Sequence, residues 1–278
     1  MRSIRLICLA VVLCLRTLAA EAEIAPEMAT RLLTVSGMAA VLQHLPEQMR
    51  DGFRKGFDVG TEATPPGQRT QIDAALEGAY SADRMQATVL DRVRRGLDHA
   101  QAEALLHWYH GELGTEITRL ETAGLGDERT GEQIIADNSA RIAAMPPRRK
   151  ALLERAIVAS RAIQMAENLV INTTLGLEHG ARAARGQVTG SDALIELRSR
   201  LESTRPALSE AFLALSLAMS AEAYRALSVE QLAAYVDFLE SPAGSRFHEI
   251  GVAALDTALL DAARLLGRLL PLTDGPAI

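Results

Sequence analysis

Apolar residues recur at helical spacing through long windows of this sequence, and runs in which apolar and polar residues strictly alternate are absent. Alanine and leucine dominate, and aromatic residues make up only 4% of the chain, so the β-branched and aromatic runs that favour strands are missing. Clusters of glycine and proline separate the helical windows. We therefore predict an all-α fold. The predicted helices cover residues 26–57 (bent near Pro46), 68–96, 98–110, 112–122, 131–144, 148–184, 191–203, 206–226, 228–240 and 242–270.

A second constraint is an internal repeat at an offset of 130 residues. Residues 97–101 (LDHAQ) align with residues 227–231 (LSVEQ), and both segments place a capping residue three positions before a glutamine. This spacing is the capping box, in which a side chain such as Ser228 and the glutamine, here Gln231, satisfy free backbone N–H groups at a helix start. Further aligned pairs are Trp108 with Phe238, Gly114 with Gly244, and Leu120 with Ile250.

A looser match, at an offset of 124, sets residues 33–56 beside residues 157–180. Two copies of one helical unit explain both matches, with the boundary near Pro146. We therefore predict two related helical-bundle domains in tandem, a divergent first copy over residues 23–145 and a second copy over residues 146–278.

Residues 1–22 have the pattern of a secretory signal peptide. Basic residues precede a stretch of nine apolar residues (ICLAVVLCL), and an A-x-A cleavage site ends at Ala22. Nine apolar residues are too few to cross a bilayer, which needs about 20. We expect cleavage after Ala22 and a periplasmic or secreted mature chain that does not span the membrane, with an uncleaved anchor as the alternative. Both cysteines, Cys8 and Cys14, lie in this segment, so the mature chain would have no disulfide and no thiolate metal ligand.

The chain is mildly acidic, with a formal net charge of −6 at pH 7. Proteins that bind nucleic acid or anionic membranes usually present basic surfaces. We therefore expect no nucleic-acid partner.

The turn before the last predicted helix carries a motif in which an aromatic residue precedes Ser-Pro-x-Gly, formed by Phe238, Ser241, Pro242 and Gly244. A serine at this point caps a helix, and a proline fits the first helical position, where no N–H is needed. We expect Gly244 to leave room for the close approach of another helix. The motif is therefore predicted to be structural.

Together with the capping box that precedes it, this motif resembles the signature of an exported bacterial helical family catalogued as domain of unknown function 2059. The resemblance is best over residues 205–262. The first half departs from it, because Gly111-Glu112 stands where Ser-Pro would be. The resemblance implies a small helical domain in an exported protein. It implies no activity, because none is established for the family.

Four residues of the helix predicted over 98–110 form a polar stripe that suggests a metal site, namely His99, Glu103, His107 and His110. Imidazole and carboxylate groups bind zinc, and two histidines three positions apart on a helix can reach one ion. The opposite face of this helix is apolar, so the stripe also fits the exposed face of an amphipathic helix. One helix rarely completes a tetrahedral site, and the sequence shows no partner ligands. We predict an exposed polar face and keep zinc or copper binding as an alternative.

The sequence contains no G-x-S-x-G and no H-E-x-x-H motif. Residues 126–132 have the glycine spacing of a P-loop, but Glu132 stands where the phosphate-binding lysine belongs, so we expect an ordinary loop. We therefore predict no enzymatic activity and no cofactor.

The leading hypothesis is a protein-interaction or chaperone-like module with an unidentified protein partner. The alternatives are a carrier that holds an apolar ligand between helices and a metal-binding protein. A carrier needs an internal apolar cavity of roughly 300 Å³ or more. An interaction module needs an exposed apolar patch instead.

Overall fold

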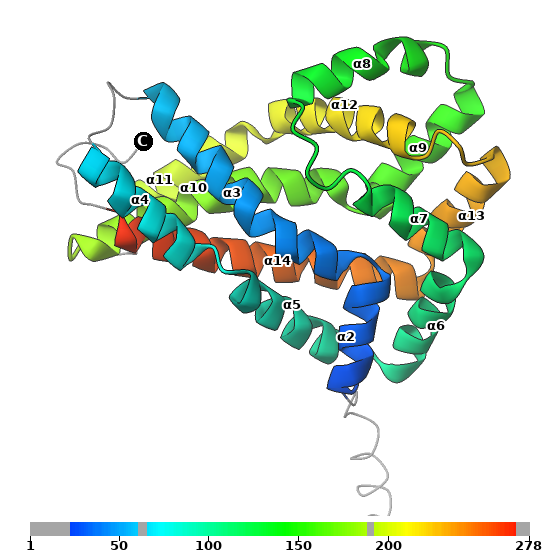
Figure 1. The fold of residues 1–278 in the computed structure, drawn as a ribbon, viewed down its shortest axis with the longest axis horizontal. Helices are drawn as coiled ribbons and strands as arrows, with labels where there is room; N and C mark the ends of the chain where they lie inside the picture. Colours follow the sequence, from blue (N-terminus) through cyan, green and yellow to red (C-terminus); the bar gives the residue numbers. More distant parts are fainter. Residues whose placement is uncertain (1–22, 61–65, 188–191, 271–278) are drawn as a thin grey trace, which may run out of the picture.

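The computed structural model describes residues 23–60, 66–187 and 192–270, so the predicted signal peptide over residues 1–22 lies outside the described residues (Figure 1). Within the described ranges the chain forms helices and no β-strand, which confirms the all-α class. None of the described helices is long and apolar enough to cross a membrane. In chain order the helices are α2 (Pro26–Val35), α3 (Met38–Gly60), α4 (Pro66–Ala79), α5 (Ala82–Gly96), α6 (His99–His110), α7 (Glu112–Thr122), α8 (Gly131–Ala143), α9 (Pro147–Ala159), α10 (Ala162–Ala184), α11 (Asp192–Ser203), α12 (Arg205–Ala223), α13 (Val229–Glu240) and α14 (Pro242–Leu269).

Two predicted helices of the first half are each divided in the structure, so their predicted extents were wrong. The helix predicted over 26–57 is broken at Gly37, whose φ is +77°. Glycine adopts this left-handed conformation without a clash because it has no Cβ. Pro46, near which a bend was predicted, lies inside α3. The window 68–96 is interrupted between α4 and α5.

The window 148–184 is also divided, between α9 and α10. The residue at the break is Arg161, whose φ is 58°. A left-handed backbone costs a residue with a side chain about 1–2 kcal/mol, so such residues rarely mark a helix end. Nothing in the local sequence indicates this corner.

The buried side chains form two core clusters, and each draws on both sides of the predicted boundary near Pro146. The first cluster joins α2 to α6 with α14 and includes Leu32, Leu76, Val89, Leu105, Phe247 and Leu259. The second cluster joins α7 with α9, α12 and α13 and includes Ile117, Leu153, Leu217, Leu232 and Val236. α7 of the first half and α14 of the second half thus each pack in the core of the other half. A tandem of two separately packed domains is therefore not confirmed.

Aromatic rings join the two halves where α6 meets α13. Trp108 and Phe238 stack with ring centroids 4.3 Å apart and an interplanar angle of 5°. Tyr109 meets Phe238 edge-on, with ring centroids 5.5 Å apart. Since Trp108 and Phe238 are aligned in the sequence, two equivalent positions contact each other.

The helix boundaries follow the two offsets found in the sequence. α6 and α13 each contain 12 residues and start at residues 99 and 229. α3 and α10 each contain 23 residues and start at residues 38 and 162. A left-handed residue, Gly37 or Arg161, precedes the longer helix in each half. Figure 1 shows α14 running through the middle of the molecule beside α10.

Candidate functional site

The predicted capping boxes are present in both halves. The Ser228 side chain accepts a hydrogen bond from the Gln231 N–H at 3.1 Å, and the Gln231 side chain accepts one from the Ser228 N–H at 2.8 Å. Asp98 and Gln101 make the same pair of bonds at 2.8 and 3.1 Å. These residues start α13 and α6, so their role is structural.

The corner between α13 and α14 is also structural. Ser241 Oγ accepts a hydrogen bond from the Gly244 N–H at 3.1 Å and donates one to the Phe238 carbonyl oxygen at 2.7 Å. Pro242 occupies the first position of α14, as predicted.

Glycine is required at position 244 because the end of α13, the preceding helix, lies very close to it. A Cβ built on Gly244 would lie 2.1 Å from the Phe238 carbonyl oxygen. A Cβ on Gly114 would lie at the same distance from the Trp108 carbonyl oxygen. The two halves therefore share a tight corner, although only the second contains Ser-Pro.

The polar stripe predicted on α6 lies on the exposed face of that helix. His99, Glu103, His107 and His110 are all exposed, as expected for the outer face of the helix. His99 Nε2 lies 3.2 Å from a Glu103 carboxylate oxygen. In the described part of the chain, no group of three or more His, Cys, Asp or Glu side chains is placed to hold a metal ion.

A cleft of about 480 Å³ opens to solvent at the corner between α9 and α10. We call it the α9–α10 cleft. Its lining residues are Ile157, Val158, Ala159, Arg161, Ile163, Gln164, Glu167 and Ser245. Apolar side chains from the end of α9 and the start of α10 thus lie beside a small number of polar groups. A mainly apolar lining with a few polar groups is the composition that small-molecule sites generally have.

Glu167 is the buried acidic residue of this cleft, with 6% of its surface exposed. One carboxylate oxygen accepts a hydrogen bond from Arg205 at 2.7 Å, and the other accepts one from the Ser209 hydroxyl. Asn168 accepts a bond from Arg205 at 3.3 Å and donates one to Asp256 at 2.6 Å. Glu167 therefore has an ion-pair partner inside the protein, and Arg205 also pairs with Glu202, at 2.8 Å.

Arg161 has no ion-pair partner of this kind. Its guanidinium contacts the Gln164 side-chain oxygen at 3.4 Å, and no described carboxylate lies within ion-pair distance of it. Nearby on α14, His248 Nε2 is buried without a hydrogen-bond partner among the described residues. Desolvation and the positive charge of Arg161 lower the pKa of His248 to about 4. The imidazole is therefore neutral at pH 7.

The corresponding corner of the first half is filled. There Gly37 approaches α7 so closely that a Cβ would lie 2.8 Å from Thr122 Cγ2 and 3.2 Å from Thr118 Cγ2. The Thr118 hydroxyl also donates a hydrogen bond to the Val35 carbonyl oxygen at 3.1 Å. In the sequence offsets, Gly37 corresponds to Arg161 and Thr118 to His248. The open cleft is thus a feature of the second half.

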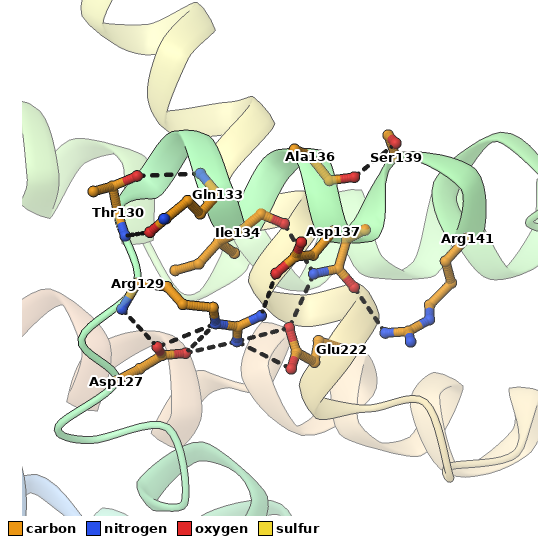
Figure 2. Close-up of polar contacts among 11 residues, drawn as sticks. Asp127, Arg129, Thr130, Gln133, Ile134, Ala136, Asp137, Ser139, Arg141 and Glu222 are labelled. Atoms are coloured by element: carbon orange, nitrogen blue, oxygen red, sulfur yellow. Dashed lines mark hydrogen bonds and ion pairs between the residues drawn. The ribbon is translucent and has the colours of Figure 1, made fainter.

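Two further polar clusters connect helices. Figure 2 shows the Arg129 guanidinium among the carboxylates of Asp127, Asp137 and Glu222, at 2.6, 3.0 and 3.1 Å. Asn138 also donates a hydrogen bond to Glu222, at 2.9 Å. These contacts hold α8 and its preceding loop against α12. Residues 126–132, expected to form an ordinary loop, comprise the end of this loop and the first two residues of α8. We assign the cluster a structural role.

The second polar cluster lies between α7 and the second core. The hydroxyls of Tyr224 and Tyr235 donate hydrogen bonds to one carboxylate oxygen of Glu121, at 2.5 and 2.6 Å. Desolvation of the Glu121 carboxyl raises its pKa, and the two hydrogen bonds oppose this shift. The residue keeps an exposed side, although its carboxyl is surrounded by protein atoms. Sequence reasoning missed this cluster because its members are far apart in the chain.

Comparisons with protein-family models, with curated proteins and with solved structures find no match. The resemblance of the second half to domain of unknown function 2059 therefore stays a prediction. The candidate site has to be interpreted from its own geometry.

Proposed function

We propose that this protein is an exported, non-enzymatic binding module that engages a protein partner through the helices α9 to α12. One observation carries the proposal. Among the described residues, seven large apolar side chains are exposed, and six of them lie on these four helices. The six are Val158, Met165, Val170, Ile195, Leu213 and Met219.

The degree of exposure supports a contact surface. Val158 is 70% exposed and Ile195 is 66% exposed. Single exposed apolar residues are normal on a soluble protein, whereas contiguous apolar patches are typical of interaction sites. The six residues come from four consecutive helices. In the first half, the corresponding helices α2 to α5 contribute none of the seven.

The polar clusters favour binding over catalysis. The buried carboxylate of Glu167 is held by Arg205 and Ser209. The half-buried carboxylate of Glu222 is held by Arg129 and Asn138. Groups that act as general acids or bases need access to a substrate and a suitable pKa. These carboxylates instead have partners within the protein, so we assign them to the fold.

A second candidate function is the carriage of a small apolar ligand. The α9–α10 cleft, with its volume of about 480 Å³, exceeds the roughly 300 Å³ that such a ligand needs. The cleft is open to solvent and lies at one corner, whereas a carrier usually encloses most of its ligand. We therefore rank partner binding first.

We also propose that residues 23–270 contain two copies of one six-helix unit, α2 to α7 and α9 to α14, separated by α8. The equal lengths of α3 and α10 and of α6 and α13 support this arrangement. So does the tight corner that Gly114 and Gly244 share. In this interpretation, partner binding arose in the second copy.

The proposal can be tested by affinity purification of the protein from its native exported fraction. We expect a protein partner to copurify with the parent protein and to be lost when Val158→Asp and Ile195→Asp are combined. The control is Leu269→Asp, which charges the exposed apolar residue that lies outside α9 to α12, and it should retain the partner. Loss of the partner in the control alone, or copurification of no protein at all, would contradict the proposal.

A further inference from the structure

One cation of the α9–α10 cleft, Arg161, has no carboxylate at ion-pair distance among the described residues. The carboxylate of the cleft, Glu167, is paired with Arg205, which also pairs with Glu202. The field at this end of the cleft therefore favours an anion. Arg161 also adopts a left-handed backbone, with a φ of 58°, which glycine would adopt at lower cost.

The start of α10 adds to this field. α10 contains 23 residues, and no described side chain caps its first turn. The first N–H groups of a helix have no partner within the helix, and the helix dipole makes this end attractive to anions. Ile163 and Gln164, which belong to this first turn, line the cleft.

A buried polar group on α14 is also unpaired. Ser245 lines the cleft, and His248 lies three residues further along the same face of α14. The His248 Nε2 atom is buried and has no hydrogen-bond partner in the described part of the chain. Buried polar atoms nearly always have a partner, and His248 Nε2 is one of six in the described residues that lack one. It lies near Arg161, and the protein does not use its hydrogen-bonding capacity.

The remaining lining residues are apolar. Ile157, Val158 and Ile163 lie next to Arg161 in sequence and line the same cleft. The fold does not require the opening, because the corresponding corner of the first half is closed by the contacts of Gly37 with Thr118 and Thr122. The charge of Arg161 has no counterpart at the aligned position of the first half, which is Gly37.

We propose that the α9–α10 cleft binds a small carboxylate with an apolar body. The carboxylate would lie at Arg161 and the start of α10, and the apolar body would lie against Ile157, Val158 and Ile163. This site goes beyond partner binding, and its test is independent of any partner protein.

The test is isothermal titration calorimetry of the full mature chain with octanoate, a straight-chain carboxylate. Octan-1-ol has the same chain length without the charge, and it serves as the matched ligand control. Octanoate should bind saturably at one site, and octan-1-ol should bind at least tenfold more weakly. Equal affinity for the two ligands, or no saturable binding of octanoate, would overturn the proposal.

Two variants locate the charge. Arg161→Gly removes the guanidinium and suits the left-handed backbone, so it should raise the melting temperature while it weakens octanoate binding at least tenfold. Arg161→Gln should weaken binding to a similar extent. Arg148→Gln removes an exposed cation from α9 outside the cleft lining and should leave binding unchanged. If Arg161→Gly folds and binds octanoate as the parent protein does, the assignment is wrong, and an equal loss in Arg148→Gln would also reject it.

Discussion

Replacement of Gly244 by alanine tests whether the corner before α14 is as tight as the structure shows. The new Cβ would lie 2.1 Å from the Phe238 carbonyl oxygen. Carbon and oxygen atoms normally stay about 3.3 Å apart or more, so α13 and α14 would have to separate by roughly 1 Å. The obstructing atom belongs to the backbone, so no side-chain rotation can relieve the contact.

The magnitude follows from three contributions. Overpacking costs about 1–3 kcal/mol and occasionally more. Displacement of the Gly244 N–H from Ser241 Oγ removes a cap that contributes about 0.5–2 kcal/mol. Alanine is favoured over glycine within a helix by about 1 kcal/mol, which opposes these costs. We therefore expect Gly244→Ala to lower the free energy of unfolding by about 0.5–4 kcal/mol.

The chain provides both a repeat and a control for this experiment. Gly114→Ala should destabilise to a similar extent, because its Cβ would lie 2.1 Å from the Trp108 carbonyl oxygen. Gly52 lies within α3, and no described atom would lie within 4 Å of its Cβ, so Gly52→Ala should stabilise by about 0.5–1 kcal/mol. Urea denaturation followed by circular dichroism measures all three. If Gly244→Ala is as stable as the parent protein, the reasoning about the corner is refuted.

Four further predictions follow from the same structure. Ser241→Ala should lower the free energy of unfolding by about 0.5–2 kcal/mol through loss of a cap, and a parent-like urea midpoint would contradict this. His248 has a pKa of about 4 when folded, below its ordinary 6.5, so the unfolded chain binds the proton first. Its contribution, on the order of 3 kcal/mol, should be present above pH 6.5 and be lost as the pH falls towards 4, a loss that thermal melts of His248→Gln should not show. The pKa of Glu121 is raised in the folded protein, so the folded state loses stability as the pH rises through that pKa and the carboxyl ionises. Glu121→Gln should therefore have a higher melting temperature than the parent protein at pH 7. A lower melting temperature would contradict this assignment. Intact mass of the exported protein should correspond to a chain that begins at Glu23, and a retained Met1 would revive the membrane-anchor alternative.

The local features of this fold could be predicted because their causes are local. The capping pair Ser228 and Gln231, like the Ser241 cap and Pro242, depends on residues within a few positions of one another. Helical periodicity likewise identified every helical window, because an amphipathic helix repeats its pattern along the chain. These parts of the structure need no information about distant contacts.

The other features depend on contacts between distant segments. The break at Arg161 has no glycine or proline to mark it, so helical periodicity continues through the corner. α7 packs in the core cluster of the second half and α14 in that of the first half, because of which apolar faces meet. The apolar pattern of each helix would be the same if it packed within its own half. The α9–α10 cleft follows from this break and this packing, so it could not be found from the sequence. The four-residue stripe on α6 shows the same limit for metal sites. The spacing of possible ligands on one helix does not tell whether ligands from other helices lie near them.

The central claim is that the exported protein binds a protein partner through α9 to α12. Native mass spectrometry of the protein purified from its own exported fraction tests it most directly. We expect a species heavier than the mature chain by the mass of a second, different protein. A bare mature chain, or a chain that carries only a small ligand, would contradict it.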